Sequence, residues 1–394
     1  MRKVPKLRFK EFSEEWEEKR LGEIIEQLIA GVSVNSNEQT QVNSNTKAIL
    51  KTSCIYDGKF IENEAKEILL EEINKVKLFA QKGQILISRM NTPQLVGALA
   101  YIEKDFYNRY LPDRIWQTKF KNEEYDGKFL SYLLNTPKYN FKIRELATGT
   151  SNSMKNISKE NFLNLSIFIP LDIEQEKIAN FLSNIDKKIS LTEEKLELFR
   201  EYKKGVMQKI FSQELRFKDS DGNDYPEWKE KRLGEILTSK SSAISQNTLE
   251  NNEGIYSVYG AIGKIKNINF YENENEYIGI VKDGAGVGRT FLCEKKSSVL
   301  GTLNYLELKT KSIYLKFAYY ILKQIDFSKY IVGSSIPHIY FKDYKNEKIQ
   351  LPILEEQQKI ADFLSSIDSK IESIEKEFEG LKEFKKGLLQ QMFV

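Results

Sequence analysis

The stretch DGAGVG at Asp283–Gly288 is the part of the sequence closest to a nucleotide-binding loop. It reads G-x-G-x-G followed by Arg289, not G-x-G-x-x-G, and the next residues, RTFLCEKKSSVL, lack a helical pattern. Without a helix N-terminus there is no dipole to hold a phosphate, so the stretch is predicted to be a turn. No G-x-x-x-x-G-K-[ST] motif occurs, and the sequence therefore gives no sign of an ATP motor.

The residue types most used in catalysis and metal binding are scarce. The chain of 394 residues has one histidine, His338, and two cysteines, Cys54 and Cys293, which excludes a disulfide scaffold, a cysteine zinc site and most histidine-based triads. Both cysteines are predicted to be buried small hydrophobes, and a reducing cytoplasm fits them.

Two further enzyme signatures are absent. The stretch PDRIWQTK at Pro112–Lys119 places its acid and its lysine too close together for the two successive strands of a metal-dependent nuclease. No two of the eight prolines are adjacent, so the N/D-P-P-aromatic motif of DNA amino-methyltransferases does not occur. The sequence offers no catalytic constellation and no metal site.

The chain contains an internal duplication. The heptapeptide EKRLGEI occurs at Glu18–Ile24 and again at Glu230–Ile236, each time after an LRF and an EW motif. Further on, Pro170–Phe211 aligns with Pro352–Phe393 at a constant offset of 182, and half of the 42 positions are identical. Between these shared segments the two halves differ in length and in almost all of their sequence. The duplication has therefore kept a frame and let two bodies diverge.

Each shared closing segment predicts a long helix with a coiled-coil seam. Apolar residues recur at steps of three and four over about four heptads, interrupted on the main stripe by Lys203 and Lys385. Two matched stripes in one chain most simply pack against each other, and the equivalent bodies before them predict an antiparallel pair with pseudo-twofold symmetry. Additional apolar positions could widen the seam or form a second face for partner helices; these are Phe181, Tyr202, Phe363 and Phe384.

Each body has the pattern of a mixed α/β domain with short strands. The β-rich runs GQILISRM and YIGIVKDG end in polar turns, helical spacing follows, and each body closes with a Gly/Ser/Thr turn and a last strand. The predicted fold class is therefore mixed α/β, with two small domains that are each followed by a long helix. The predicted boundaries are 1–170 for the first domain, 171–212 for its helix, 213–352 for the second domain and 353–394 for its helix.

Charge is unevenly distributed along the chain. The net charge is +3, segment 172–212 is neutral and segment 353–394 carries −3, so the two bodies together carry +6. Mildly basic bodies are what phosphate contact would require, although ordinary variation between surfaces gives the same numbers. No apolar run reaches the roughly 18 residues of a membrane span, and the charged N-terminus has no secretory h-region, so no membrane partner is expected.

This frame resembles the specificity subunit of a type I restriction–modification system. The likeness covers essentially the whole chain. It rests on the LRF…EW…RLGEI openers, on ILISRMNTPQLVGALA and IGIVKDGAGVGRT, on the turns TGTS and VGSS, and most specifically on the duplicated P-x3-EQ-x-KIA-x-FLS-x-ID block. The resemblance implies two target recognition domains joined by an antiparallel coiled coil, and no catalysis by this chain.

The resemblance also implies partners and cofactors. The expected ligand is double-stranded DNA with a bipartite, asymmetric target, and the expected protein partners are two methyltransferase (modification) subunits and, through these, restriction subunits. S-adenosylmethionine, ATP and magnesium are expected on those partner subunits, and no cofactor is expected on this chain. The expected localisation is cytoplasmic.

Polar residues on loops at strand ends are the candidates for DNA contact, because a rigid sheet can present them. Arg89 and Arg289 could each span O6 and N7 of a guanine, and Asn91 or Gln94 could pair with adenine. For every candidate the alternative is a solvated loop position or a phosphate contact. The candidates are Arg89, Asn91, Thr92, Gln94, Thr150, Ser151, Asn152, Ser153 and Lys155 in the first body, and Lys282, Asp283, Arg289, Ser334, Ser335, His338 and Tyr340 in the second.

A function of a different class is also open. The chain could be a cytoplasmic coiled-coil adaptor whose two bodies bind proteins, and the lack of a strong basic stripe favours that reading. An enzyme in its own right is weakened by the missing motifs. Salt dependence separates a DNA reader from an adaptor, because phosphate contacts release counterions and lose affinity steeply as salt rises.

Overall fold

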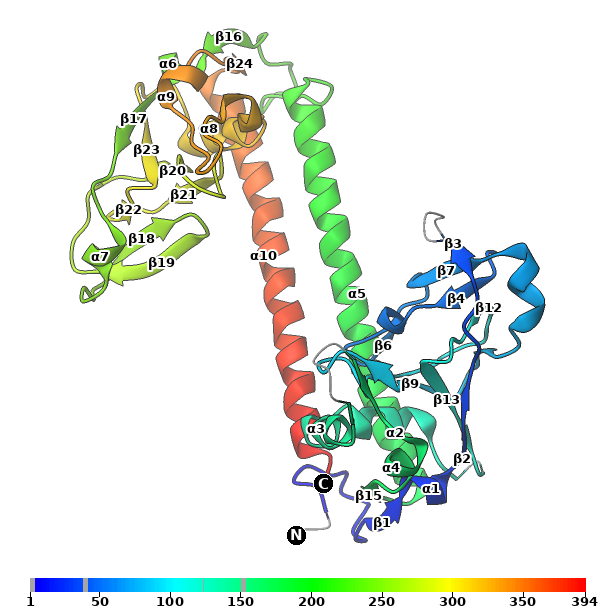
Figure 1. Ribbon diagram of the computed structural model, residues 1–394. Helices are drawn as coiled ribbons and strands as arrows, with labels where there is room; N and C mark the ends of the chain where they lie inside the picture. Colours follow the sequence, from blue (N-terminus) through cyan, green and yellow to red (C-terminus); the bar gives the residue numbers. More distant parts are fainter. Residues whose placement is uncertain (1–3, 38–41, 123, 150–153) are drawn as a thin grey trace. The chain divides into compact units, whose positions relative to one another are not determined.

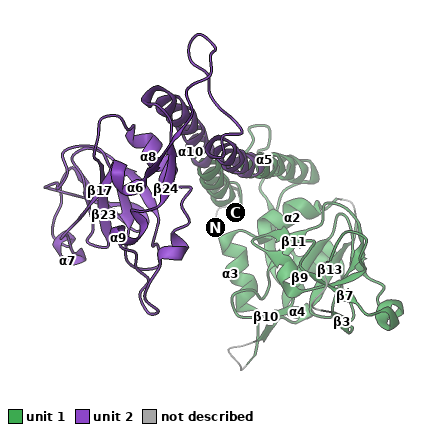
Figure 2. Cartoon of the chain, turned by 90° about the horizontal axis from the view of Figure 1, so that it is seen from above, with its two compact units in different colours: residues 1–193, 376–394 green, residues 194–375 purple. Residues whose placement is uncertain are grey.

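The computed structural model describes residues 4–37, 42–122, 124–149 and 154–394. The chain divides into two compact units, residues 1–193 with 376–394 and residues 194–375 (Figure 2). Each unit holds one body together with parts of both long helices, α5 (Asp172–Phe211) and α10 (Leu354–Gln391), which are the green and the orange-to-red helices of Figure 1. The predicted class is confirmed: the fold is mixed α/β, with two long helices that pack together.

The first body is built on two sheets. A four-stranded antiparallel sheet has the order β11 (Leu99–Tyr101), β9 (Ile85–Ser88), β13 (Ile115–Phe120), β2 (Ile25–Ala30). A five-stranded sheet has the order β3 (Ser36–Asn37), β7 (Ala65–Ile68), β4 (Ala48–Leu50), β12 (Phe106–Tyr110), β8 (Phe79–Ala80). Two-stranded pairs are β1 (Glu17–Arg20) with β15 (Ser166–Ile169), β10 (Met90–Asn91) with β14 (Lys155–Asn156), and β5 (Ile55–Tyr56) with β6 (Lys59–Phe60). Its helices are α1 (Leu21–Ile24), α2 (Gly127–Leu134), α3 (Pro137–Glu145) and α4 (Lys159–Leu163), with 3-10 turns η1 (Thr52–Cys54) and η2 (Leu70–Lys75).

The second body repeats the four-stranded sheet and the edge pair with other residues, and its second sheet is smaller. Its four-stranded antiparallel sheet has the order β21 (Thr290–Cys293), β20 (Tyr277–Val281), β23 (Leu303–Leu308), β17 (Leu237–Ser241), and its second sheet has the order β19 (Gly263–Ile268), β18 (Tyr256–Gly260), β22 (Ser298–Val299). The pair β16 (Lys229–Arg232) with β24 (Lys348–Leu351) corresponds to β1 with β15. Its helices are α6 (Leu233–Ile236), α7 (Gln246–Leu249), α8 (Leu315–Leu322) and α9 (Phe341–Tyr344), with the 3-10 turn η3 (Phe327–Tyr330).

The repeated heptapeptide closes each body at its edge. Its first letters form β1 or β16, which pairs with the last strand of the body, and LGEI forms one helical turn. Its glycine lies against a backbone carbonyl: a Cβ on Gly22 would lie 3.3 Å from the oxygen of Leu163, and one on Gly234 would lie 3.1 Å from that of Lys345. The same local contacts therefore account for the same residues in both copies of the heptapeptide.

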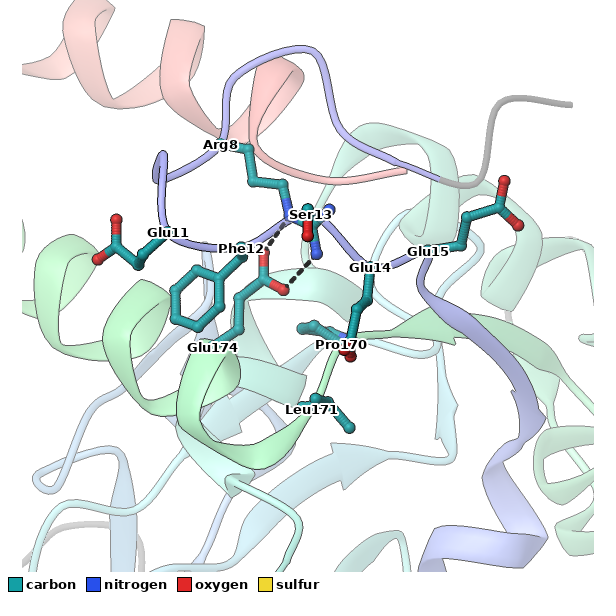
Figure 3. A pocket seen from close by; sticks show the side chains of 9 residues that line it. All are labelled: Arg8, Glu11, Phe12, Ser13, Glu14, Glu15, Pro170, Leu171 and Glu174. Carbon is teal, nitrogen blue, oxygen red and sulfur yellow. Dashed lines mark hydrogen bonds and ion pairs between the residues drawn. The ribbon is translucent and has the colours of Figure 1, made fainter.

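The first turn of each long helix is tied to the LRF motif by a buried ion pair. Arg8 donates from Nε and Nη2 to the two carboxylate oxygens of Glu174 at 2.8 and 2.7 Å (Figure 3). Arg216 donates in the same way to Glu356, at 2.9 Å for each bond. The side chains of Glu174 and Glu356 are 2% and 0% exposed, so these carboxylates depend on their arginines.

The glutamine that follows each glutamate ties the long helix to its body. The Gln175 side-chain oxygen accepts from the backbone N–H of Asp126, the N-cap of α2, at 3.2 Å. The Gln357 side-chain oxygen accepts from the backbone N–H of Tyr314, the N-cap of α8, at 2.9 Å. The EQ letters of the duplicated block thus have equivalent structural roles in the two copies.

An aromatic trio in each unit includes a residue from the far end of a long helix. In the first unit Phe393, just after α10, lies 6.3 Å from Trp16 and 5.6 Å from Phe129 between ring centroids. The second unit contains the equivalent trio Phe211, Trp228 and Phe317. The first body is therefore closed by the end of the second helix, and the second body by the end of the first.

The predicted apolar stripes are the packed faces of the long helices. Ile178, Leu182 and Leu196 of α5 are buried, as are Ile360 and Leu364 of α10. In the first unit Asp186 pairs with Lys385 and Lys188 with Glu377, so α10 numbers fall as α5 numbers rise and the helices run antiparallel. Across the described ranges, no helix combines the length and apolar character needed to cross a membrane.

Replacing Arg216 with methionine should destabilise the protein strongly, because it leaves the buried carboxylate of Glu356 without its cation. We expect the free energy of unfolding in urea to fall by about 3 kcal/mol. The matched control is Arg200→Met, which breaks the exposed Arg200–Glu375 pair and should cost less than about 1 kcal/mol. Equal losses in the two variants would contradict the role given to burial.

Candidate nucleic-acid interface

The candidate site in each body begins where the second strand of the four-stranded sheet ends. Arg89 follows β9, and its backbone N–H donates to the carbonyl of Arg114 at 3.1 Å. Lys282 follows β20, and its N–H donates to the carbonyl of Thr302 at 2.9 Å. Arg114 and Thr302 each immediately precede the neighbouring central strand, so Arg89 and Lys282 occupy equivalent positions in the two bodies.

The Gly/Ser/Thr turn of each body returns to this strand end. In the first body the N–H of Ile157 donates to the carbonyl of Arg89 at 2.9 Å, and in the second the N–H of Ile339 donates to that of Lys282 at 2.9 Å. Lys155 lies opposite Asn91 in the β10–β14 pair, and His338 forms a bridge with Asp283. The structure therefore brings together the two candidate segments of each body. Candidates Thr150, Ser151, Asn152 and Ser153 lie outside the described residues.

The first-body candidates differ in how far they are engaged within the protein. Arg89 donates from Nε to the carbonyl of Asp113 at 2.7 Å and from Nη1 to Asn156 at 3.2 Å. Asn91 is only 7% exposed and donates to Ser88 Oγ at 3.1 Å. The exposed candidates of this strand-end segment are Thr92 and Gln94. Lys155 donates from Nζ to the carbonyl of Gly149 at 2.6 Å.

The second-body candidates form a denser cluster. Lys282 and Asp283 form an ion pair, and Arg289 donates from Nη1 to the carbonyl of Ala261 at 2.9 Å. The rings of His338 and Tyr340 lie 4.9 Å apart. The exposed members are Arg289, Ser334, Ser335 and Tyr340.

The DGAGVG stretch is a turn, as predicted, and strand β21 rather than a helix follows it. Gly288 has φ +83, and its N–H donates to the carbonyl of Val281 at 2.9 Å. Gly97 of the first body has φ +81, and its N–H donates to the carbonyl of Ser88 at 2.8 Å. The backbone geometry that the two bodies share accounts for these glycines without a ligand.

A basic depression next to Arg89 was missed by the sequence analysis. It encloses about 270 Å³ and begins one residue from Asp113, whose carbonyl Arg89 binds. Its walls carry cations and hydroxyl groups from four separate segments: Ser33, Ser36, Lys51, Thr52, Lys66 and Arg114, with Val34, Ile49, Leu50 and Pro112. The sequence did contain a signal for this depression. Lys51 and Arg114 stand at the ends of buried strands, which is the criterion that selected Arg89.

A second missed feature is the tip of the β18–β19 hairpin. Its Ala261 carbonyl accepts the bond from Arg289, and a Cβ on Gly286 would lie 3.5 Å from Ala261. The next residue, Ile262, is 81% exposed. The hairpin tip therefore borders the cluster of the second body and adds an apolar side chain to it.

The pocket beside Arg8 has the opposite character. It encloses about 140 Å³, and Figure 3 shows that acidic side chains surround it: Glu11, Glu14, Glu15 and Glu174. Phosphate would be repelled there, because four carboxylates face two cations that are already paired, Arg8 with Glu174 and Lys177 with Glu11.

The proposed partner-binding residues fall into two pairs. Phe181 packs edge-on against Phe9 at 5.7 Å, and Phe363 against Phe217 at 5.5 Å, so the LRF motif covers both in part. The exposed pair is Tyr202 and Phe384, at 52% and 55%.

Metal-binding side chains are not clustered in the part of the chain that the structure describes. No cluster of three or more His, Cys, Asp or Glu side chains suited to a metal ion occurs among those residues. Cys54 and Cys293 are free and buried, as predicted. Burial raises the pKa of both thiols, that of Cys293 to about 12, so neither is a thiolate near neutral pH.

These features define a class of protein: two units that share a four-stranded sheet and an edge pair but have unlike loops, each holding one body and parts of both long helices. The chain matches the family described as "Type I restriction modification DNA specificity domain" over residues 13–198 and 225–383, and it belongs to that family. Specificity subunits are non-catalytic, and this chain is accordingly not an enzyme.

Individual relatives agree with the family. The chain is 26% identical to the specificity subunit of the type I restriction enzyme MjaVIII of Methanocaldococcus jannaschii, over 95% of this chain and 91% of that protein. The crystal structure of a type I restriction–modification S subunit from M. genitalium has the same fold, with a TM-score of 0.69, 21% identity and 99% of each chain covered. A chain from a study of assembly and conformational transition of the type I system gives a TM-score of 0.52 at 18% identity, covering 96% of this chain and 97% of that one.

Replacing Gly288 with alanine should destabilise the second body, because a Cβ there would lie 2.7 Å from the Cβ of Phe327 and φ is positive. We expect a loss of about 3 kcal/mol in urea unfolding. Gly286→Ala is the control: it has no positive φ and ordinary contacts, and should cost less than about 0.5 kcal/mol. A tolerated Gly288→Ala would argue that this glycine is retained for a ligand instead.

Proposed function

We propose that this chain is the specificity subunit of a type I restriction–modification complex and reads a bipartite, asymmetric DNA target with its two bodies. The observation that carries the proposal is the equivalent pair of loops in each body. The two pairs share their backbone hydrogen bonds and differ in their side chains, as two readers of different half-sites would.

The first body would read bases from the strand-end loop and hold the backbone in the basic depression. Arg89 and Gln94 lie on that loop, and Arg114 and Lys51 line the depression. Phosphate contacts fix position and base contacts give specificity, so a reader needs both kinds side by side. The second body would use Lys282, Arg289 and the turn from Ser334 to Tyr340.

The long helices would fix the distance between half-sites and dock two methyltransferase subunits, with restriction subunits bound through these. Tyr202 and Phe384 are candidates for that docking because they are exposed aromatic side chains on helices. S-adenosylmethionine, ATP and magnesium would belong to those partners. An adaptor that binds only proteins would need no basic depression.

Removing charge from the basic depression should weaken DNA binding and flatten its salt dependence. The slope of log K against log salt is negative for a DNA-binding protein. We expect Lys51→Gln with Arg114→Gln to reduce the magnitude of this slope by about 2, because binding releases about one counterion fewer for each phosphate contact that is lost. The measurement is titration of an arbitrary duplex with the chain and its co-expressed methyltransferase partner at several salt concentrations.

The matched control for this charge removal is Lys6→Gln with Lys10→Gln. It removes the same charge from exposed positions close to the acidic pocket of the first unit, and it should leave the slope unchanged. Equal slopes in all three proteins would move the DNA surface elsewhere. Binding with no salt dependence in the unaltered protein would favour the adaptor.

Lengthening both long helices by one heptad should widen the target spacer. Insertion of seven residues after Glu193 and after the equivalent Glu375 keeps the apolar stripes and adds about 10 Å, or roughly three base pairs. Methylated bases mapped across a genome would give the spacer. Inserting five residues at the same places rotates the stripes by about 140° and should abolish assembly. A heptad variant with the original spacer would show that the helices do not set the distance.

A further inference from the structure

Two lysines stand on the apolar stripes of the long helices and are largely buried there. Lys385 of α10 lies 2.5 Å from the carboxylate of Asp186 on α5 in the first unit. Lys203 of α5 pairs with Asp368 of α10 in the second unit. The lysine side chains are only 24% and 20% exposed. Each pair joins one long helix to the other at equivalent positions of the duplication.

A tyrosine from the body completes each pair. In the first unit the hydroxyl of Tyr132, on α2, donates to the other oxygen of Asp186 at 2.6 Å, and the ammonium of Lys385 lies 5.5 Å from the tyrosine ring. In the second unit Tyr320, on α8, makes the same two contacts at 2.7 and 5.4 Å. Burial, reinforced by the aspartate, raises the pKa of both tyrosines, so each keeps its proton and donates.

Apolar packing alone does not require these groups. Half of the aligned closing positions have diverged, yet the lysine and the aspartate stand in both copies, and two otherwise unlike bodies each supply the tyrosine. Buried ion pairs seldom add stability over apolar residues of similar size. A polar residue on a helical seam specifies register instead, at a cost in stability.

We propose that the two Lys–Asp–Tyr clusters are positioning devices that fix the register of the helix pair and the seat of each body on it. This rests on the proposed function, because the consequence is a single spacer length in the DNA target. Sliding α10 by one heptad in one direction would place the lysines opposite Ala179 and Ala361. Sliding in either direction would leave Asp186 and Asp368 without their cation. It would also draw Phe393 and Phe211 out of their aromatic trios, so the clusters act together with the helix ends in selecting one register.

The test combines Lys203→Met with Lys385→Met in the chain co-expressed with its methyltransferase partner, followed by genome-wide mapping of methylated adenines. Methionine keeps the stripe apolar, and the side chains of Asp186 and Asp368 are 33% and 38% exposed and stay accessible to water, so the thermal midpoint should change little. We expect both half-sites to be kept, with a minor second spacer length about three base pairs from the first. Lys203→Arg with Lys385→Arg should restore the single spacer.

The matched control is Lys188→Met with Arg200→Met, which breaks exposed pairs between the same helices and should keep one spacer. A single spacer in the Lys203/Lys385 methionine variant would overturn the proposal, and so would its unfolding, because the lysines would then serve stability and not register. The double variant Tyr132→Phe with Tyr320→Phe is an independent test of the tyrosines. An added spacer length would support the proposal, and a single unchanged spacer would show that the tyrosines do not help to fix the register. If the unaltered protein yields no bipartite motif, the proposed function itself has failed.

Discussion

The end of each long helix closes the hydrophobic core of the body from the other half of the sequence. Phe393 completes the cluster around Trp16, and Phe211 completes the one around Trp228. Neither body therefore has a complete core within its own stretch of sequence, and both helices must be in place for either to fold. This reciprocal closure explains why the ends of the duplicated blocks are retained, down to the last phenylalanine, while the bodies have diverged.

The sequence was sufficient to predict the segments that the two halves share, because the duplication makes them visible as repeats. Two copies of one block reveal which letters the fold requires, and the stripe of apolar residues gives the helices and their pairing. The turn at Asp283–Gly288 and the absence of a following helix were also predictable from local pattern. The packing of each helix end against the body from the other half of the sequence could not be predicted. Periodicity shows that a residue is buried, but it does not show which residues it packs against.

The candidate interface could be predicted only where one continuous segment of the sequence contains the signal. The rule of polar residues at strand ends found Arg89 and Lys282, and the structure joins each to its returning turn. The basic depression was missed because Lys51 and Arg114 lie more than sixty residues apart and meet only through the sheet. Burial of Asn91 could not be foreseen either, because a polar side chain in a two-residue strand has no sequence signature.

Backbone hydrogen bonds hold the two candidate loops of each body, and this explains how their sequences could diverge. The bonds from Ile157 to Arg89 and from Ile339 to Lys282 use main-chain groups that every residue except proline can supply. Side chains on these loops can therefore change without moving the loops. A surface that must acquire new specificities benefits from such a scaffold, because contacts stay preorganised while their chemistry is replaced.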